Sequence, residues 1–186
     1  MRYIGDVHGK MSGYLKAIEN CPASVQVGDF GYGFIEIPAL PAGHRQIRGN
    51  HDNPFLCRES STWIPDMTVE GDTFFMGGAF SLDWALRQQG IDLWNEEELS
   101  YTKMMRAIDV YENTNPSIVV THDCPNEVAD IIFSRYGGSR TSAALQAMFE
   151  IHQPDLWVFG HWHSSQRQVI KGTQFICLAE LEHIDI

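Results

Sequence analysis

The chain has 186 residues, of which 44% are hydrophobic, 11% aromatic and 20% charged, a composition typical of one globular domain rather than of a disordered chain or a coiled coil. Lysine and arginine number 13 against 24 aspartates and glutamates, which gives a formal net charge of −11 with neutral histidines. Because such a negative field repels nucleic-acid polymers and anionic membranes at long range, generic binding to either is disfavoured.

Short apolar runs alternate with stretches of helical periodicity along the chain. In order, the sequence predicts a strand at Arg2–Ile4, a helix over Met11–Ile18, strands at Ser24–Val27, Gln46–Arg48 and Thr73–Met76, a helix from Glu96 to about Glu112, a strand at Ser117–Val120, helices at Asn126–Phe133 and Thr141–His152, a strand at Asp155–Phe159 and a hairpin over Arg167–Leu178. This alternation predicts an α/β fold with some parallel strand pairing, and no repeat or linker divides residues 1–186 into more than one domain.

Polar side chains of one chemical kind follow five of the predicted strands. In chain order they are Asp6 and His8, then Asp29, then Asn50, His51 and Asp52, then His122, and last His161 and His163. Because the carboxyl ends of strands form the usual binding crevice of α/β sheets, we expect these side chains to converge. Carboxylate, imidazole and amide groups in this number suit two divalent ions, and the lack of paired cysteines excludes a tetrathiolate zinc site.

Each of these segments also has an ordinary structural interpretation when it is taken alone. Asp6 is of the type that caps helices, and Asp29 follows a glycine, as turn residues often do. His122, after an apolar strand, suits a buried and hydrogen-bonded histidine. The metal-binding interpretation therefore depends on all five segments occurring together along one chain.

The five segments in this order resemble the calcineurin-like metallophosphoesterase superfamily. They read Gly5-Asp6-Val7-His8-Gly9, Gly28-Asp29, Gly49-Asn50-His51-Asp52, the lone His122, and Gly160-His161-Trp162-His163. A further segment, Gly77-Gly78-Ala79-Phe80-Ser81 with Asp83 and Arg87, is similar to one in small bacterial and phage members. The resemblance covers nearly the whole chain and implies two facing mixed β-sheets flanked by helices, a four-layer α/β sandwich.

The resemblance also implies a role for individual residues. Asp6, His8 and His163 would bind one metal ion, Asn50, His122 and His161 would bind a second, and Asp29 would bridge the two. The cofactors would be two divalent ions, manganese first, with iron, zinc or nickel as alternatives. His51 would be the catalytic histidine, oriented by Asp52, and Arg87 and Arg140 are candidates for holding substrate phosphate.

These roles predict hydrolysis of phosphate mono- or diesters by a hydroxide shared between two metal ions, with His51 as general acid. The expected partner is a small phosphorylated substrate, a nucleotide or a short oligonucleotide end, with no extended nucleic-acid track. The family's protein phosphatases carry an Asp-Arg-Gly segment where this chain has Phe30-Gly31-Tyr32-Gly33, which argues against that activity. The alternative function is a catalytically weak or inactive metal-binding scaffold of the same fold.

The cellular location is predicted from what the sequence lacks. No apolar run approaches the ~18 residues needed to span a bilayer, and charged residues come too early in the chain for a signal peptide. The four cysteines are widely separated, so we expect free thiols. We therefore expect a cytoplasmic protein with no membrane partner.

Overall fold

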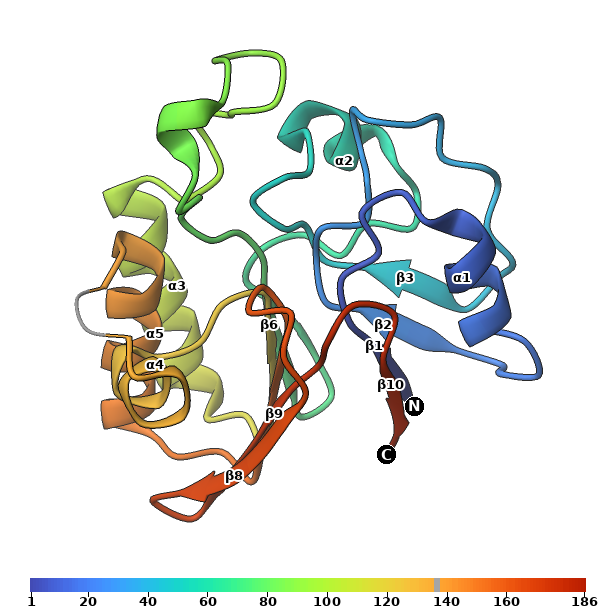
Figure 1. The fold of residues 1–186 in the computed structure, drawn as a ribbon. Helices are drawn as coiled ribbons and strands as arrows, with labels where there is room; N and C mark the ends of the chain where they lie inside the picture. Colours follow the sequence, from blue (N-terminus) through green and yellow to red (C-terminus); the bar gives the residue numbers. More distant parts are fainter. Residues whose placement is uncertain (136–137) are drawn as a thin grey trace.

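The computed structural model describes residues 1–135 and 138–186, and within them two β-sheets face each other (Figure 1). The smaller sheet has four strands in the order β10-β1-β2-β3. Its strands are β1 (Arg2–Ile4), β2 (Ser24–Gln26), β3 (His44–Gln46) and β10 (His183–Asp185). β1, β2 and β3 run parallel, and β10 pairs with β1 in the antiparallel direction.

The larger sheet has six strands among the described residues, in the order β4-β5-β6-β7-β9-β8. They are β4 (Thr68–Glu70), β5 (Thr73–Met76), β6 (Ile118–Thr121), β7 (Leu156–Phe159), β8 (Gln166–Ile170) and β9 (Thr173–Cys177). The four inner strands are parallel, and both edge strands are antiparallel to their neighbours. Both sheets are therefore mixed, as expected.

Helices cover the outer face of each sheet (Figure 1). α1 (Met11–Ala17) and α2 (Pro54–Glu59) lie beside the smaller sheet, and α3 (Tyr101–Thr114), α4 (Asn126–Phe133) and α5 (Arg140–Ile151) lie beside the larger one. A short 3₁₀ helix, η1 (Trp84–Leu86), interrupts the long connection between β5 and α3. In the described part of the chain, no helix has the length and apolarity needed to cross a membrane.

The core is layered because side chains of a strand alternate between its two faces. In β7, Trp157 and Phe159 pack against the helices, whereas Leu156 and Val158 face the other sheet, and all four are buried. A central cluster joins side chains from both sheets, such as Val27 and Val120. The expected α/β sandwich of two facing sheets flanked by helices is confirmed.

The expected elements differ from the structure at β3, which covers His44–Gln46 instead of the predicted Gln46–Arg48, and between β5 and α3. The predicted helix from Glu96 begins only at Tyr101, where the Ser100 side chain accepts a hydrogen bond from the Lys103 amide. Glu97 and Glu98 lie before the helix and are buried by tertiary contacts. The sequence interpretation also missed α2, β4 and β10, which are all six residues or shorter.

Candidate metal centre

The polar segments that follow five strands meet between the two sheets. Asp6, Asp29 and Asn50 follow β1, β2 and β3 of the smaller sheet, and the remaining residues follow β6 and β7 of the larger sheet. Four residues of these segments, His8, Asp29, His161 and His163, have positive φ angles of 48–67°. Left-handed backbone costs free energy in residues other than glycine and is concentrated at functional sites.

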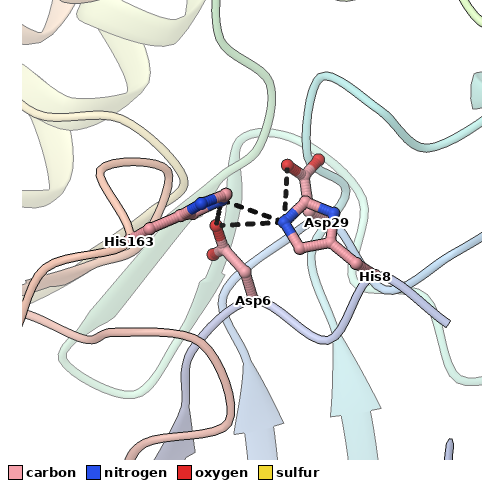
Figure 2. A group of neighbouring side chains, drawn as sticks. All are labelled: Asp6, His8, Asp29 and His163. Carbon is pink, nitrogen blue, oxygen red and sulfur yellow. Dashed lines mark hydrogen bonds and ion pairs between the residues drawn. The ribbon is translucent and has the colours of Figure 1, made fainter. Parts of the chain in front are cut away.

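One group of ligand atoms comes from Asp6, His8, Asp29 and His163, whose atoms all lie within 4.8 Å of one another (Figure 2). The two Nε2 atoms of His8 and His163 are 2.9 Å apart, and His163 Nε2 is 3.0 Å from Asp6 Oδ2. His8 Nε2 lies 3.9 Å from Asp29 Oδ2. Two imidazole nitrogens and two carboxylates that converge in this way fit a divalent cation with nitrogen and oxygen ligands.

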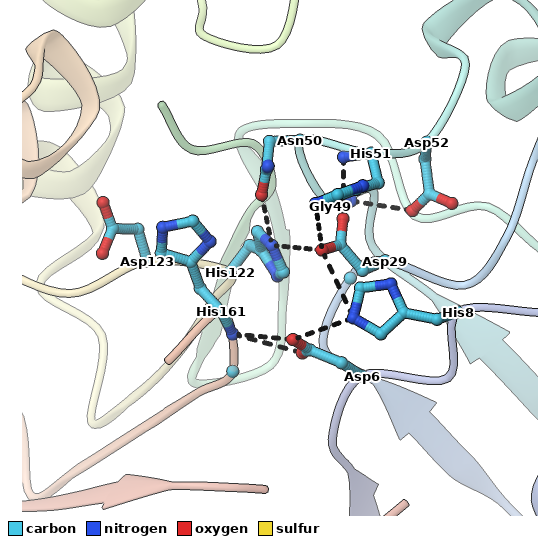
Figure 3. A network of polar contacts seen from close by, with 12 residues as sticks. Asp6, His8, Asp29, Gly49, Asn50, His51, Asp52, His122, Asp123 and His161 are labelled. Atoms are coloured by element: carbon cyan, nitrogen blue, oxygen red, sulfur yellow. Dashed lines mark hydrogen bonds and ion pairs between the residues drawn. The ribbon is translucent and has the colours of Figure 1, made fainter. Parts of the chain in front are cut away.

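A second group adjoins the first across the Asp29 carboxylate (Figure 3). His122 Nε2 is 2.9 Å from Asn50 Oδ1 and 3.4 Å from Asp29 Oδ2. The other ring nitrogen of His122 lies 2.8 Å from the Val27 carbonyl, a contact that directs Nε2 into the site. The His161 ring lies 5.1 Å from the His122 ring, centroid to centroid. Asp29 Oδ2 is therefore shared by both groups.

The electrostatics of the second group favour positive charge beside Asp29. Burial opposes charge on both partners, but Asp29 raises the pKa of His122 to about 10, and His122 with its neighbouring imidazoles holds the pKa of Asp29 well below its usual range. Burial and the charge of His122 lower the pKa of His161 to about 3. Neutral imidazole is the form that binds metal, so His161 is already in that form at physiological pH, whereas His122 would release a proton when a cation binds.

His51 lies at the wall of an open cleft of about 360 Å³, which is also lined by His8, Asp29, Asn50, His161 and His163. Its backbone N–H donates to Asp29 Oδ1 at 2.8 Å, and its ring lies 5.2 Å from the His8 ring, centroid to centroid. Burial, together with the positive charge of Arg87, lowers the pKa of the His51 ring, although Asp29 opposes this. Leu82 and Trp162 form the apolar part of the cleft wall.

Of the two arginines that the sequence offered as phosphate ligands, neither is among the residues that line the described cleft, but Arg87 contacts one that is. The Arg87 guanidinium contacts His51 Nε2 and lies 2.8 Å from Asp83 Oδ1, and its side chain is only 6% exposed. Arg140 instead lies 3.3 Å from Glu98 Oε2 and lines a neighbouring hollow. A substrate role stays a prediction for both, and Arg87 is the one that contacts His51.

Asp52 occupies a different place from the expected one. Its carboxylate accepts hydrogen bonds of 2.8–3.0 Å from the backbone N–H groups of Phe30, Gly31, Tyr32 and Gly49. In the part of the chain that the structure describes, these amides rather than the His51 ring are its hydrogen-bond partners. Asp52 therefore joins the loops after β2 and β3, and the expectation that it orients His51 is wrong.

The Asp52→Asn variant is expected to lower the free energy of unfolding by about 2–3 kcal/mol, since its amide NH₂ would face backbone donors that now contact a carboxylate. Urea unfolding would measure this loss. The variant should retain its metal content. If the stability were unchanged while the dependence of turnover on the leaving group changed, Asp52 would act on His51 after all.

Two glycines of the motifs leave room for the ligand side chains themselves. A Cβ on Gly49 would lie 2.0 Å from Asp29 Oδ1 and 2.2 Å from the Asp29 backbone nitrogen. A Cβ on Gly160 would lie 2.2 Å from Asp6 Oδ1. Because these two glycines have no Cβ, the loop after β3 packs directly against Asp29 and the loop after β7 packs directly against Asp6.

Because of this contact, Gly49→Ala should displace Asp29 and weaken metal binding. Overpacking of this kind costs about 1–3 kcal/mol, and for a chain of this size each ~1 kcal/mol lowers the Tm by about 2–4 °C. Calorimetric melting and metal analysis of the purified variant would measure both effects. A variant with the Tm and metal content of the natural chain would contradict this account of Gly49.

Sequence reasoning missed several residues around the site. Ser81 and Glu97 are buried behind Asn50 and Arg87. Trp162 donates to Asp123 Oδ1 at 3.1 Å and stacks on Phe133, which fixes one wall of the cleft. The sequence signals near them were the segment from Gly77 to Arg87, which carries Ser81, and the Gly160-His161-Trp162-His163 segment, which carries Trp162.

Comparisons with known proteins show a family and similar folds. The family model described as calcineurin-like phosphoesterase matches residues 3–165. The fold is similar to that of a phosphopantetheinyl hydrolase from Mycobacterium tuberculosis, with a TM-score of 0.58 and 13% identity, over 96% of this chain and 89% of that one. A candidate 5′-nucleotidase from Staphylococcus aureus, solved with α-ketoglutarate, gives a TM-score of 0.56 and 12% identity over 96% of this chain, which spans 48% of that longer protein. A search of curated protein sequences gave no match.

Proposed function

The chain belongs to the calcineurin-like phosphoesterase family, and from that membership we propose that it hydrolyses phosphate esters with two divalent metal ions. The observation that carries the proposal is the shared position of Asp29, whose Oδ2 lies 3.9 Å from His8 Nε2 in one ligand group and 3.4 Å from His122 Nε2 in the other. One carboxylate between two sets of imidazoles suits a pair of cations better than a single one.

The proposed ligands divide between the two groups described above. Asp6, His8 and His163 would hold the first cation, Asn50, His122 and His161 would hold the second, and Asp29 would bridge them. The backbone N–H of His161 donates to both carboxylate oxygens of Asp6. This contact joins a residue of the second group to a residue of the first. Nitrogen and oxygen ligands without thiolate suit manganese, and also iron, zinc or nickel.

The chemistry of hydrolysis follows from the positions of the cleft residues. When bound, the two cations would neutralise phosphoryl oxygens and lower the pKa of the attacking water. His51, at the cleft wall, gives a proton to the departing oxygen, which otherwise leaves poorly as an alkoxide. Arg87 lies against His51 and carries a guanidinium that suits the remaining phosphate oxygens.

The substrate class follows from the size and charge of the cleft. A cleft of about 360 Å³ accommodates a small phosphorylated molecule, a nucleotide or one end of an oligonucleotide, as a monoester or a diester. The two structural neighbours described above, a phosphopantetheinyl hydrolase and a candidate 5′-nucleotidase, support a small substrate. The formal charge of −11 leaves no extended basic track for a nucleic-acid polymer.

The proposal is tested with p-nitrophenyl phosphate and bis-p-nitrophenyl phosphate, which report monoesterase and diesterase activity respectively. Protein treated with chelator and dialysed should be inactive, and Mn²⁺, Fe²⁺, Zn²⁺ or Ni²⁺ should restore turnover. Absence of turnover with every metal, despite two bound ions per chain, would favour the metal-binding scaffold.

A further inference from the structure

Three buried side chains outside the proposed ligand set adjoin the site from the connection between β5 and α3. They are Ser81, Arg87 and Glu97. Ser81 is 1% exposed, Glu97 is 6% exposed, and the side chain of Arg87 is 6% exposed. Asn50 Nδ2 donates to Ser81 Oγ at 2.9 Å. Glu97 is buried beside them and faces the Arg87 guanidinium. The three side chains therefore lie behind a proposed metal ligand on one side and behind His51 on the other.

The contact between Asn50 and Ser81 fixes the orientation of the Asn50 amide. An amide NH₂ group only donates, so Ser81 Oγ accepts from Asn50 Nδ2. Since the two ends of an amide point in different directions, Oδ1 of Asn50 is turned towards His122, where the second cation would lie.

Glu97 also faces the catalytic side of the cleft. Its Oε1 lies 3.7 Å from Arg87 Nη1, and the same guanidinium contacts His51 Nε2. The Trp94 backbone N–H donates to Glu97 Oε1 at 3.3 Å, and the Trp94 indole donates to the His51 carbonyl at 3.1 Å. Glu97 is therefore linked to the surroundings of His51 through Arg87 and Trp94.

The backbone that carries Glu97 is itself held in place. Arg48 is 3% exposed, pairs with Asp66 at 2.9 Å and donates to the carbonyls of Glu96 and Glu97 at 2.7 and 3.0 Å. A Cβ on Gly78 would lie 2.3 Å from the Glu97 carbonyl oxygen, so the two loops pack directly. Such support is what a residue needs if it is to position others within tenths of an ångström.

We propose that Ser81 and Glu97 are positioning residues, Ser81 for the oxygen of Asn50 that faces the second metal ion and Glu97 for Arg87 beside His51. The inference rests on the proposed function, because it assumes the ligand role of Asn50 and the proton transfer by His51. It adds two residues that never touch the substrate. Outer residues of this kind typically change metal affinity or activity by about 10–100-fold.

The role of Ser81 is tested by metal binding, which needs no turnover. Metal-free Ser81→Ala protein titrated calorimetrically with Mn²⁺ should bind the second equivalent about 10–100-fold more weakly than the natural chain and the first equivalent normally. Thr141→Val is the matched control, since it also removes a buried hydroxyl, one that makes no hydrogen bond among the described residues. Natural affinity for both ions in Ser81→Ala, or an equal loss in Thr141→Val, would overturn the proposal.

The role of Glu97 is tested by the leaving-group dependence of turnover. Glu97→Gln keeps the shape of the side chain but removes one of the two carboxylate charges that face Arg87, while Asp83 keeps the other. We therefore expect kcat on alkyl phosphates to fall roughly tenfold more than kcat on p-nitrophenyl phosphate. Glu98→Gln is the control, because Glu98 is the adjacent buried acid and instead accepts from the Thr141 backbone at 2.8 Å. An equal fall on both esters, or the same pattern in Glu98→Gln, would overturn this part.

Failure of the inference and failure of the proposed function give different results. If the natural chain bound two Mn²⁺ ions but hydrolysed no ester, the proposed function would fail, while the comparison of Ser81→Ala with Thr141→Val would still decide the role of Ser81. If the natural chain hydrolysed esters and Ser81→Ala matched it in both metal affinities, the inference would fail alone.

Discussion

Asp29→Asn is expected to lose both metal ions together and to reduce turnover by at least about 100-fold, beyond the range typical of residues outside the ligand set. The substitution keeps the shape of the side chain but removes the charge that lies between His8 and His122. It also leaves an amide in a buried position where several imidazoles now stabilise a carboxylate. Metal analysis of the purified variant, alongside kcat/KM on p-nitrophenyl phosphate, measures both effects.

Asp52→Asn is the natural control for this variant, since Asp52 is equally buried and close by but contacts only backbone amides among the described residues. It should melt at a lower temperature and still contain two metal ions. If Asp29→Asn kept two tightly bound ions, or lost only one, the bridging position of Asp29 would be refuted.

His51→Ala should keep both metal ions and lose turnover selectively. A general acid contributes typically 10²–10⁴-fold, so hydrolysis of alkyl esters, which need a proton on the departing oxygen, should fall by that factor. Esters of p-nitrophenol, whose leaving group departs readily as an anion, should be affected much less. Steady-state kinetics on a series of esters with increasing leaving-group pKa would show a steeper dependence in the variant.

The backbone of His51 provides an internal check on this result. Its N–H donates to Asp29 Oδ1, and this contact survives removal of the ring, so metal binding should not change. Equal loss of turnover on good and poor leaving groups, with both metals retained, would argue that the ring positions the substrate rather than donating a proton.

The sequence was most informative where residue type and position act together. Glycine followed by aspartate or histidine at strand ends predicted which loops meet, because strands deliver their carboxyl ends to one edge of a sheet. The structure brings Asp6 and Asp29 of two such segments together with His122, which follows Thr121 instead of a glycine. The assignment of each ligand to the first or the second metal ion came from the family resemblance, because the positions of strand ends do not determine it.

What the sequence did not predict depends on contacts between distant segments. The Asp52 carboxylate and the amides it binds after β2 are 20–22 residues apart, so its true partners are visible only in the folded chain. Glu96 to Glu98 fits the acidic first turn of a helix, but Arg48 binds the carbonyls of Glu96 and Glu97. Arg87 and Arg140 look alike in the sequence, and burial against different partners separates them.

The most direct test of the whole account follows turnover while metal is returned to the metal-free protein. Mn²⁺ is added stepwise, bound metal is measured by calorimetry, and hydrolysis of bis-p-nitrophenyl phosphate and p-nitrophenyl phosphate is assayed at each step. The account predicts little turnover with one ion per chain and full turnover with two. Full turnover at one bound ion, or in protein freed of metal, would contradict a site in which Asp29 joins two cations.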